Sequence, residues 1–298
     1  MEEMLCRRLK NVCFCTLDDI SKKTLSEKID NIDVWGWDLS VVNQLVKAGA
    51  STELMPSESV LDKLRAVSDR ATSTKLLEFL IGNLERVCGD AVAVYNINNV
   101  DEFSEKWGDI LLKSPWSSSG RGVRKWDGSC YGTRRWVEKT IETQGHIMVE
   151  RHLDKVLDFA MEFSAADDGT VKYEGLSLFD TVGGAYVGNL LAPEYEKKAI
   201  LSSYVSPQLL HDVADIICRW MEHALSGNYA GPFGVDMMIV RSKDDNGFLL
   251  NPCVEINLRR TMGHVALSLS DSEMVIGKVM RVFYENGKYH FRIESKNS

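Results

Sequence analysis

The 298-residue sequence has no apolar run that approaches the roughly 20 residues needed to cross a bilayer. It also has no excess of positive charge, since 35 lysines and arginines face 43 aspartates and glutamates, for a net charge of -8. A general nucleic-acid binder normally presents a basic face, so this balance argues against that class. The first ten residues open with acids and carry no apolar segment behind their cations, so we expect no secretory signal. These absences predict a soluble, cytoplasmic protein with no nucleic-acid or membrane partner.

The cysteines do not suggest a disulfide framework or a metal site. The chain has seven cysteines, and this odd number favours a reducing compartment. Cys13 and Cys15 are separated only by Phe14, a spacing too tight for a redox or zinc pair. Their apolar neighbours instead predict a short buried strand, in which free cysteine acts as a small hydrophobic residue.

Signatures of three common enzyme classes are absent. No G-x-x-x-x-G-K-[ST] segment occurs, which excludes a P-loop NTPase. No HRD-like or DFG-like segment occurs, and the Ser/Gly loop follows its lysine, an order that excludes a protein kinase. The six histidines are scattered and form no Ser/His/Asp arrangement. A nucleophile supplied by the protein is therefore not expected.

Apolar periodicity predicts a mixed α/β chain that begins with a βαβ unit. This unit would contain strands over residues 11–16 and 34–37, a helix over 39–48 that ends at Gly49, and an extended stretch over 51–56. Two further helices are predicted over residues 58–67 and 73–84. An amphipathic helix begins at the pair Ser206-Pro207. The chain beyond residue 85 is richer in strands, which we expect over residues 92–96, 110–113, 147–150, 159–164, 173–178, 235–240 and 248–256.

The last two predicted strands form a hairpin that carries three oxygen-bearing side chains. Asp236 lies on the first strand, and Glu255 and Asn257 lie on the second. Residues two apart on a strand share a face, so Glu255 and Asn257 point the same way, and Asp236 can lie opposite them. Carboxylate and amide oxygens suit magnesium, which completes its shell with water and substrate phosphates. The alternative is that acids on an amphipathic hairpin simply face water.

Other polar residues support a phosphate site. Lys113 ends a predicted strand and precedes the loop SPWSSSGRG, whose backbone N–H groups could surround an anion. Glu150 and Asp158 flank a linker between two strands, where backbone groups could bind adenine and a carboxylate could bind ribose. Arg259 and Arg260 follow the acidic pair directly and could bind a phosphate or a substrate carboxylate bidentately.

The order of these features over roughly residues 60 to 265 resembles the ATP-grasp superfamily of carboxylate–amine ligases, such as D-alanine–D-alanine ligase and biotin carboxylase. The resemblance is most specific in GPFGVDMMIV followed by EINLRRTMG. It implies a small N-terminal domain over residues 1–84 and an ATP-grasp domain over residues 85–298. Within the latter, residues 85–155 would form a lid subdomain and residues 156–298 a C-terminal subdomain. Two antiparallel sheets would hold ATP between them.

The resemblance also implies roles for individual residues. Lys113 would contact the α- and β-phosphates, and Arg70, with Lys75 as second choice, would supply another phosphate-side cation. The hinge against adenine would be Glu150, Arg151, His152 and Leu153, and Asp158 would bind ribose, where the family usually has glutamate. Asp236, Glu255 and Asn257 would hold magnesium, which manganese could replace. The mobile lid over the phosphates would consist of Ser117, Ser118, Ser119, Gly120, Arg121 and Gly122.

The implied reaction is ADP-forming ligation. A carboxylate would attack the γ-phosphate of ATP to give an acyl phosphate, which an amine or thiol would then break down. Arg259 would stabilise the acyl phosphate, and Arg260 and His264 are candidate substrate contacts. A nucleotide-binding regulatory protein of the same fold is the alternative, although the complete magnesium set favours the enzyme. The substrates would be small molecules, and the sequence does not set the oligomeric state, with which a homodimer is compatible.

Overall fold

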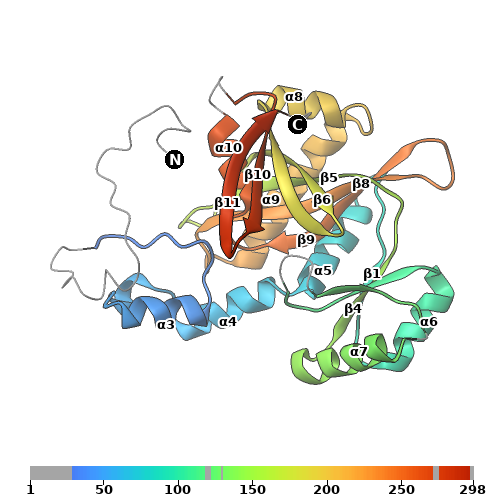
Figure 1. The fold of residues 1–298 in the computed structure, drawn as a ribbon, viewed down its shortest axis with the longest axis horizontal. Helices are drawn as coiled ribbons and strands as arrows, with labels where there is room; N and C mark the ends of the chain where they lie inside the picture. Colours follow the sequence, from blue (N-terminus) through green and yellow to red (C-terminus); the bar gives the residue numbers. More distant parts are fainter. Residues whose placement is uncertain (1–28, 118–121, 129, 271–274, 296–298) are drawn as a thin grey trace.

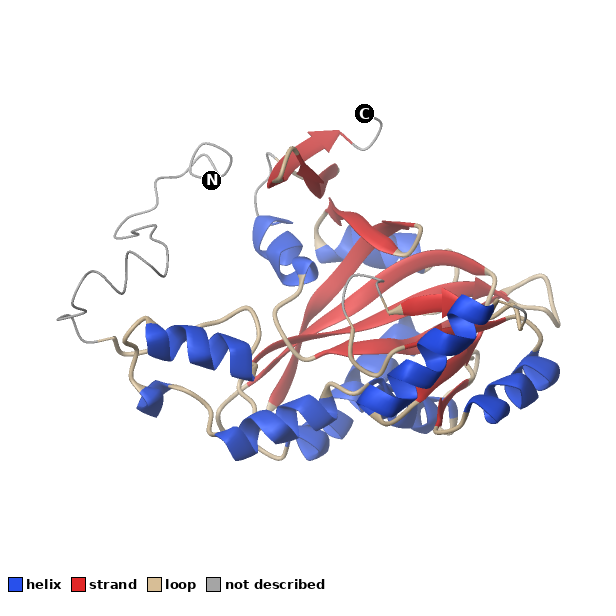
Figure 2. Ribbon diagram, turned by 60° about the horizontal axis from the view of Figure 1, so that its bottom comes forward, coloured by secondary structure: helices blue, strands red, loops and turns tan. Residues whose placement is uncertain are grey.

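The computed structural model describes residues 29–117, 122–128, 130–270 and 275–295, and two antiparallel sheets dominate it (Figure 1). The smaller sheet has four strands in the order β1-β4-β2-β3. The larger has seven in the order β11-β10-β7-β6-β5-β8-β9. In Figure 2 these strands run through the centre of the molecule, and helices line its lower edge. The predicted mixed α/β class with two antiparallel sheets is confirmed. No helix within the described ranges is long and apolar enough to span a membrane.

Residues 29–84 are helical where strands were predicted. They contain α3 (Leu39–Lys47), the 3-10 helix η1 (Thr52–Leu54), α4 (Glu58–Val67) and α5 (Arg70–Ile81). The three helices were predicted, but Trp35 and Gly36 form a bend, and no strand occurs between residues 29 and 84. The prediction of a βαβ unit is therefore wrong for this part. The strand predicted over residues 11–16, with Cys13 and Cys15, lies outside the described residues.

The strand predicted over residues 34–37 does not form because this segment contacts a loop and not another strand. The alternation of Trp35, Gly36 and Trp37 suits a strand, but this segment packs on a turn and has no strand beside it. The nearest atom to a Cβ built on Gly36 would be Arg259 Cβ, at 2.9 Å. The backbone N–H of Arg260 donates to the carbonyl of Trp35. Glycine therefore allows the close approach of two loops, and the alternation is incidental.

Helix α5 joins the N-terminal helices to the larger sheet. Asp69 caps it by accepting a hydrogen bond from Ala71 N–H at 2.8 Å. Its buried residues Leu76, Leu77 and Leu80 belong to the core of the larger sheet, and the helix packs on β9 and reaches β1 (Figure 1). This position places the start of α5, and with it Arg70, between the two sheets.

Two helices that were not predicted from the sequence pack against the smaller sheet. Its elements are β1 (Ala91–Val94), α6 (Ile97–Trp107), β2 (Ile110–Lys113), β3 (Val123–Lys125), α7 (Tyr131–Gln144) and β4 (Ile147–Arg151). The strands predicted near residues 92, 110 and 147 are confirmed. A core that includes Val100, Ile110, Val137 and Ile147 lies under the sheet, and each of these residues is fully buried. Residues 152–154 then connect β4 to β5, the first strand of the larger sheet.

One face of the larger sheet carries the core residues, and the other face carries polar residues. Its elements are β5 (Lys155–Ala165), β6 (Val171–Val182), β7 (Ala185–Leu191), α8 (Glu194–Leu201), α9 (Pro207–Leu225), β8 (Gly231–Arg241), β9 (Phe248–Asn257), α10 (Met262–Ser270), β10 (Lys278–Glu285) and β11 (Lys288–Ser295). Helix α9 begins as predicted, with Ser206 as its N-cap and Pro207 in its first turn. Odd-numbered residues of β5 and β8, such as Phe159, Phe163 and Val235, enter the core that α9 shares. The even-numbered residues of these strands therefore face the opposite side.

Candidate functional site

The hairpin β8–β9 brings the three predicted metal ligands together. Asp236 pairs in register with Glu255, and Asn257 pairs with Gly234. The Nδ2 of Asn257 donates a hydrogen bond to Asp236 Oδ2 at 3.0 Å. Since Val235 and Met237 point into the core, Asp236 lies on the opposite, polar face. Two carboxyl groups and one amide therefore share one small area of the sheet.

The charge of this cluster is only partly balanced by the protein. Burial raises the pKa of Asp236 to about 7, and the neighbouring Glu255 adds to the shift. Among the described residues, no three His, Cys, Asp or Glu side chains converge on one point. Two carboxylates and an amide form an incomplete shell, which is what magnesium uses when water and phosphate complete its coordination. The donor set therefore fits this ion.

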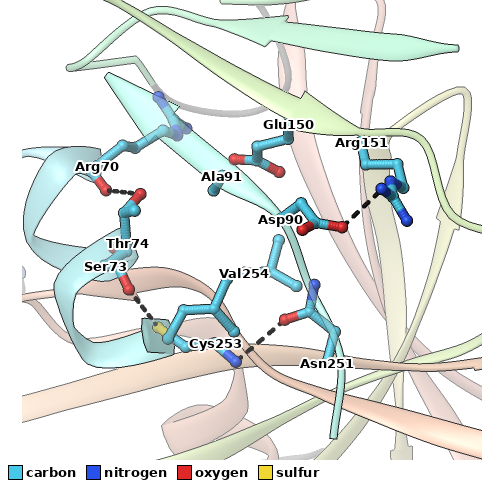
Figure 3. A pocket seen from close by; sticks show the side chains of 11 residues that line it. Arg70, Ser73, Thr74, Asp90, Ala91, Glu150, Arg151, Asn251, Cys253 and Val254 are labelled. Atoms are coloured by element: carbon cyan, nitrogen blue, oxygen red, sulfur yellow. Dashed lines mark hydrogen bonds and ion pairs between the residues drawn. The ribbon is translucent and has the colours of Figure 1, made fainter. Parts of the chain in front are cut away.

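Arg70 links the acids to the Ser/Gly loop. Both Oε1 and Oε2 of Glu255 lie 2.8 Å from Arg70 Nη2, and Nη1 donates to Ser117 Oγ at 2.9 Å. Nη1 also donates to the carbonyl of Ser114. Figure 3 shows Arg70 at the start of α5, on the side toward the strand that carries Glu150. In this state the guanidinium holds the carboxylate that the sequence assigns to the metal. Lys75, the second choice, is exposed on α5.

Lys113 occupies the end of β2, next to the loop. Its Nζ lies 2.6 Å from Glu150 Oε2, and both side chains are nearly buried. The loop leaves and returns at one point, because Ser114 N–H donates to the carbonyl of Gly122 at 2.8 Å. A Cβ on Gly122 would lie 2.3 Å from Ser117 Oγ, so this position requires glycine. The other predicted lid residues, Ser118, Ser119, Gly120 and Arg121, lie outside the described residues.

Trp116 anchors the start of this loop, a role that the sequence did not explain. The indole Nε1 donates to the carbonyl of Arg65 at 3.0 Å, and the Arg65 guanidinium lies 4.1 Å from the ring centroid. The backbone N–H of Trp116 donates to Gln144 on α7. The indole therefore fixes the near end of the loop to α4, and the backbone N–H fixes it to α7.

The predicted hinge lies where the chain passes from the smaller to the larger sheet. Glu150 and Arg151 end β4, and His152 and Leu153 begin the link to β5. The N–H of Arg151 donates to the carbonyl of Asp90, and the N–H of His152 donates to that of Asp109. The backbone of the hinge is therefore held against the smaller sheet.

Asp158 lies on the polar face of β5. It is two residues from Ala160, which pairs with Asp236, so it shares the face of the acid cluster. Its Oδ2 accepts from Thr181 Oγ1 at 2.7 Å and is paired with Lys155 Nζ. The predicted ribose ligand therefore has two partners in this state.

The two arginines after β9 point to different partners. Arg259 Nη2 donates to Asn257 Oδ1 at 2.9 Å, which keeps this guanidinium with the metal set. Arg260 Nη2 lies 2.8 Å from Asp33 Oδ2, away from the acids. His264 uses both ring nitrogens inside the protein: Nδ1 accepts from Thr261 N–H and Nε2 lies 3.2 Å from the carbonyl of Phe163. Since a carbonyl only accepts, the hydrogen of this imidazole is on Nε2.

Glu162 is a buried acid beside the site that the sequence did not single out. Burial raises its pKa to about 8, its side chain is 1% exposed, and its Oε2 lies 3.1 Å from His264 Nδ1. A Cβ on Gly263 would lie 1.8 Å from its Oε1, so glycine is required there. The Oε2 of Glu162 has no hydrogen-bond partner among the described residues, and burial favours the protonated, neutral form of this acid. The available signal was an acid in the apolar strand VLDFAMEF, four residues from Asp158 and on the same face.

Comparison with known proteins gives a likeness of structure and none of sequence. No protein-family model matches the chain, and no curated protein matches it. Biotin carboxylase of Campylobacter jejuni, solved as a β,γ-ATP complex, is 14% identical with a TM-score of 0.51, over 80% of this chain and 50% of that one. Pyruvate carboxylase T882A of Rhizobium etli, solved with the allosteric activator acetyl coenzyme A, is 16% identical with a TM-score of 0.54, over 85% of this chain and 21% of that one.

A third similar structure is N5-carboxyaminoimidazole synthetase of Staphylococcus aureus complexed with ADP, at 14% identity and a TM-score of 0.48, over 74% of this chain. This chain spans 58% of that synthetase. At such identities the likeness concerns the fold alone. The chain has the ATP-grasp fold that its motifs predicted.

Proposed function

We propose that the protein is an ATP- and magnesium-dependent ligase that activates a carboxylate as an acyl phosphate for attack by an amine. The observation that carries the proposal is that a group of acidic side chains and a group of basic side chains lie together where the two sheets adjoin. Asp236, Glu255 and Asn257 supply the acids and amide, and Arg70 and Lys113 supply the cations. A magnesium–nucleotide complex has both kinds of charge and would match both sets.

The nucleotide would lie between the sheets. Glu150–Leu153 would face adenine, and Asp158 would exchange Lys155 and Thr181 for ribose hydroxyls. Lys113 would leave Glu150 for the α- and β-phosphates, and Arg70 would leave Glu255 for another phosphate oxygen. Backbone groups of the loop from Ser117 to Gly122, Arg121 included, would cover the phosphates.

The chemistry that follows needs positioning and charge neutralisation more than a nucleophile from the protein. Magnesium, or manganese in its place, would neutralise charge on the transferred phosphoryl group when bound. Lys113 would hold the phosphate chain, and Arg259, fixed by Asn257, would orient the acyl phosphate. The loop would exclude water, which would otherwise hydrolyse the intermediate. We place this activity in the cytoplasm.

The test is phosphate release by the full chain with ATP and magnesium, across a panel of carboxylates, each with and without hydroxylamine. Hydroxylamine replaces the unknown amine because it traps acyl phosphates as hydroxamates. The expected result is phosphate release that requires a carboxylate and yields a hydroxamate. ATP binding without release on any carboxylate would instead favour the regulatory alternative.

A further inference from the structure

A pocket lies beside α10, and none of the residues that line it belongs to the acid cluster. Its volume is about 640 Å³, which is in the range of small-molecule sites. Six of the residues that line it carry the argument: Ser164, Glu174, Pro232, Arg260, His264 and Leu267. They come from β5, β6, β8, the turn after β9, and α10. The pocket is therefore built from the larger sheet and the segment that follows the predicted metal ligands.

The pocket shares a sheet face with the acid cluster. Ser164 pairs with Pro232 in the same ladder in which Ala160 pairs with Asp236. Each pair is four residues from the other, so both face the same side. Four residues of strand span about 13 Å, a distance that one small substrate molecule can cover. The pocket is thus in line with the site where the acyl phosphate would form.

Opposite charges face this pocket. The guanidinium of Arg260 is 34% exposed although one nitrogen is held by Asp33. The carboxylate of Glu174 is exposed and accepts from Ser164 Oγ. Both residues line the pocket together with His264, whose pKa is lowered mainly by burial.

The other two charged residues of the lining are occupied within the protein. Glu194 accepts from the hydroxyl of Tyr173 at 2.6 Å and from Leu176 N–H at 2.9 Å. Lys197 is 2% exposed and donates to the carbonyl of Leu176 at 2.6 Å. A ligand would therefore meet Arg260 as the cation and Glu174 as the anion, with apolar walls at Pro232 and Leu267.

We propose that this pocket binds the amine substrate as a zwitterion, an amino acid or a short peptide, with its carboxylate on Arg260 and its ammonium on Glu174. The inference rests on the proposed function and names its amine substrate class. In the reaction, the ammonium releases one proton to solvent, and the free amine forms a C–N bond to the acyl carbon. The C–O bond to phosphate breaks, phosphate leaves with the electron pair, and the nitrogen releases its second proton to solvent.

The first test is calorimetric binding to the full chain with magnesium and a non-hydrolysable ATP analogue. The probes are the twenty standard amino acids and a set of dipeptides, with matched amines that lack the carboxylate and matched acids that lack the amine. The proposal expects at least one zwitterion to bind about 10- to 100-fold more tightly than either matched analogue. Equal affinity for the analogue without a carboxylate or without an amine would overturn it, as would no binding of any zwitterion.

Substitutions then test whether Glu174 and Arg260 bind the two charged groups of the ligand. Glu174→Gln and Arg260→Met should each weaken zwitterion binding about 10-fold or more. Asp168→Asn, in the exposed β5–β6 turn, and Arg241→Met, exposed on β8, are the matched controls and should leave it unchanged. Asp33→Asn removes the protein partner of Arg260 and should not weaken binding. If the ligand still binds as tightly to Glu174→Gln and Arg260→Met, the proposal is wrong.

Failure of the inference differs from failure of the proposed function. If hydroxylamine supports turnover with a carboxylate but no zwitterion binds or replaces it, the ligase stands and the amino-acid pocket is refuted. If neither hydroxylamine nor any amine supports turnover, the ligase proposal fails. Zwitterion binding that depends on Glu174 and Arg260 would still support the pocket in that case.

Discussion

The smaller and the larger sheet contribute opposite charges to their junction. The larger sheet carries the acids Asp236 and Glu255 on its polar face, whereas the smaller sheet ends β2 with Lys113. Arg70, at the start of α5, lies between them and holds Glu255. The acids of the larger sheet therefore depend on Arg70, or on a ligand, for charge balance, whereas Lys113 is paired with Glu150 of its own sheet.

The two sides also differ in how firmly they are held. The acids lie within a long, regular hairpin over a large core, so their positions are set by strand register. The cations lie at element ends, and the smaller sheet is inserted between α5 and β5, with a connection on each side. We therefore expect nucleotide binding to rearrange the cations around a fixed set of acids. The following substitutions test that division of roles.

The largest effect is expected from the rigid side. Asp236→Asn keeps the shape but removes a charge from the metal set, so magnesium-dependent ATP turnover should fall about 1,000-fold. Phosphate release measures the loss, and circular dichroism should show an unchanged fold. Asp244→Asn, in the exposed turn of the same hairpin, is the control and should retain activity. Full activity of Asp236→Asn would remove this residue from the metal site.

A smaller effect is expected from the cation of the smaller sheet. Lys113→Met should weaken ATP binding about 10- to 100-fold, because a charged contact to phosphate is lost. Lys125→Met, on the neighbouring strand β3 and exposed, is the matched control. Calorimetry with ATP and magnesium measures both affinities. An unchanged affinity for Lys113→Met would exclude the lysine from the phosphate site.

Arg70→Met tests the link between the two sides and should act in opposite directions on two ligands. Without nucleotide, Glu255 is released, so the affinity for manganese, used as a paramagnetic probe, should rise a few-fold. The affinity for ATP with magnesium should fall, because a phosphate contact is lost. Lys75→Met, exposed on α5, should change neither affinity. A fall in both affinities would mean that Arg70 supports the acids instead of competing for them.

Glu162 is expected to affect stability and its pH dependence. Its pKa is raised to about 8 in the folded state, so the folded protein keeps a proton that the unfolded chain loses at lower pH. The free energy of unfolding should therefore fall as pH rises toward 8. Glu162→Gln mimics the protonated acid and should reduce this fall, with a gain of a few kcal/mol at pH 9, because each pKa unit between the usual value of 4.5 and about 8 corresponds to about 1.4 kcal/mol. Urea unfolding from pH 5 to 9 measures it, and an identical pH profile in both proteins would contradict the assignment.

The sequence predicted the elements whose local pattern of apolar and polar residues matches the way they pack in the structure. The hairpin was predictable because its alternation matches one buried and one polar face, and α9 because Ser206 and Pro207 mark its start. The conformation of residues 34–37 was not predictable, because it depends on a contact between Gly36 and Arg259, which are far apart in the chain.

The candidate site was predictable residue by residue, but its connections were not. The pairing of Asp236 with Glu255 follows from a hairpin, whereas the contact of Arg70 with Glu255 joins residues 185 positions apart. The burial of Glu162 likewise depends on Gly234 and Gly263 from other elements. The domain boundaries near residues 84 and 155 and the roles of the site residues stay predictions.

The most direct test of the central claim, that the two charge sets form one site for a magnesium–nucleotide complex, is calorimetric titration of the protein with ATP, with and without magnesium. The acids of the larger sheet repel the free nucleotide, and the metal joins them to it. The account predicts that ATP binds tightly only when magnesium is present, and that this dependence disappears in Asp236→Asn. Equal affinity for ATP with and without magnesium in the wild-type protein would contradict it.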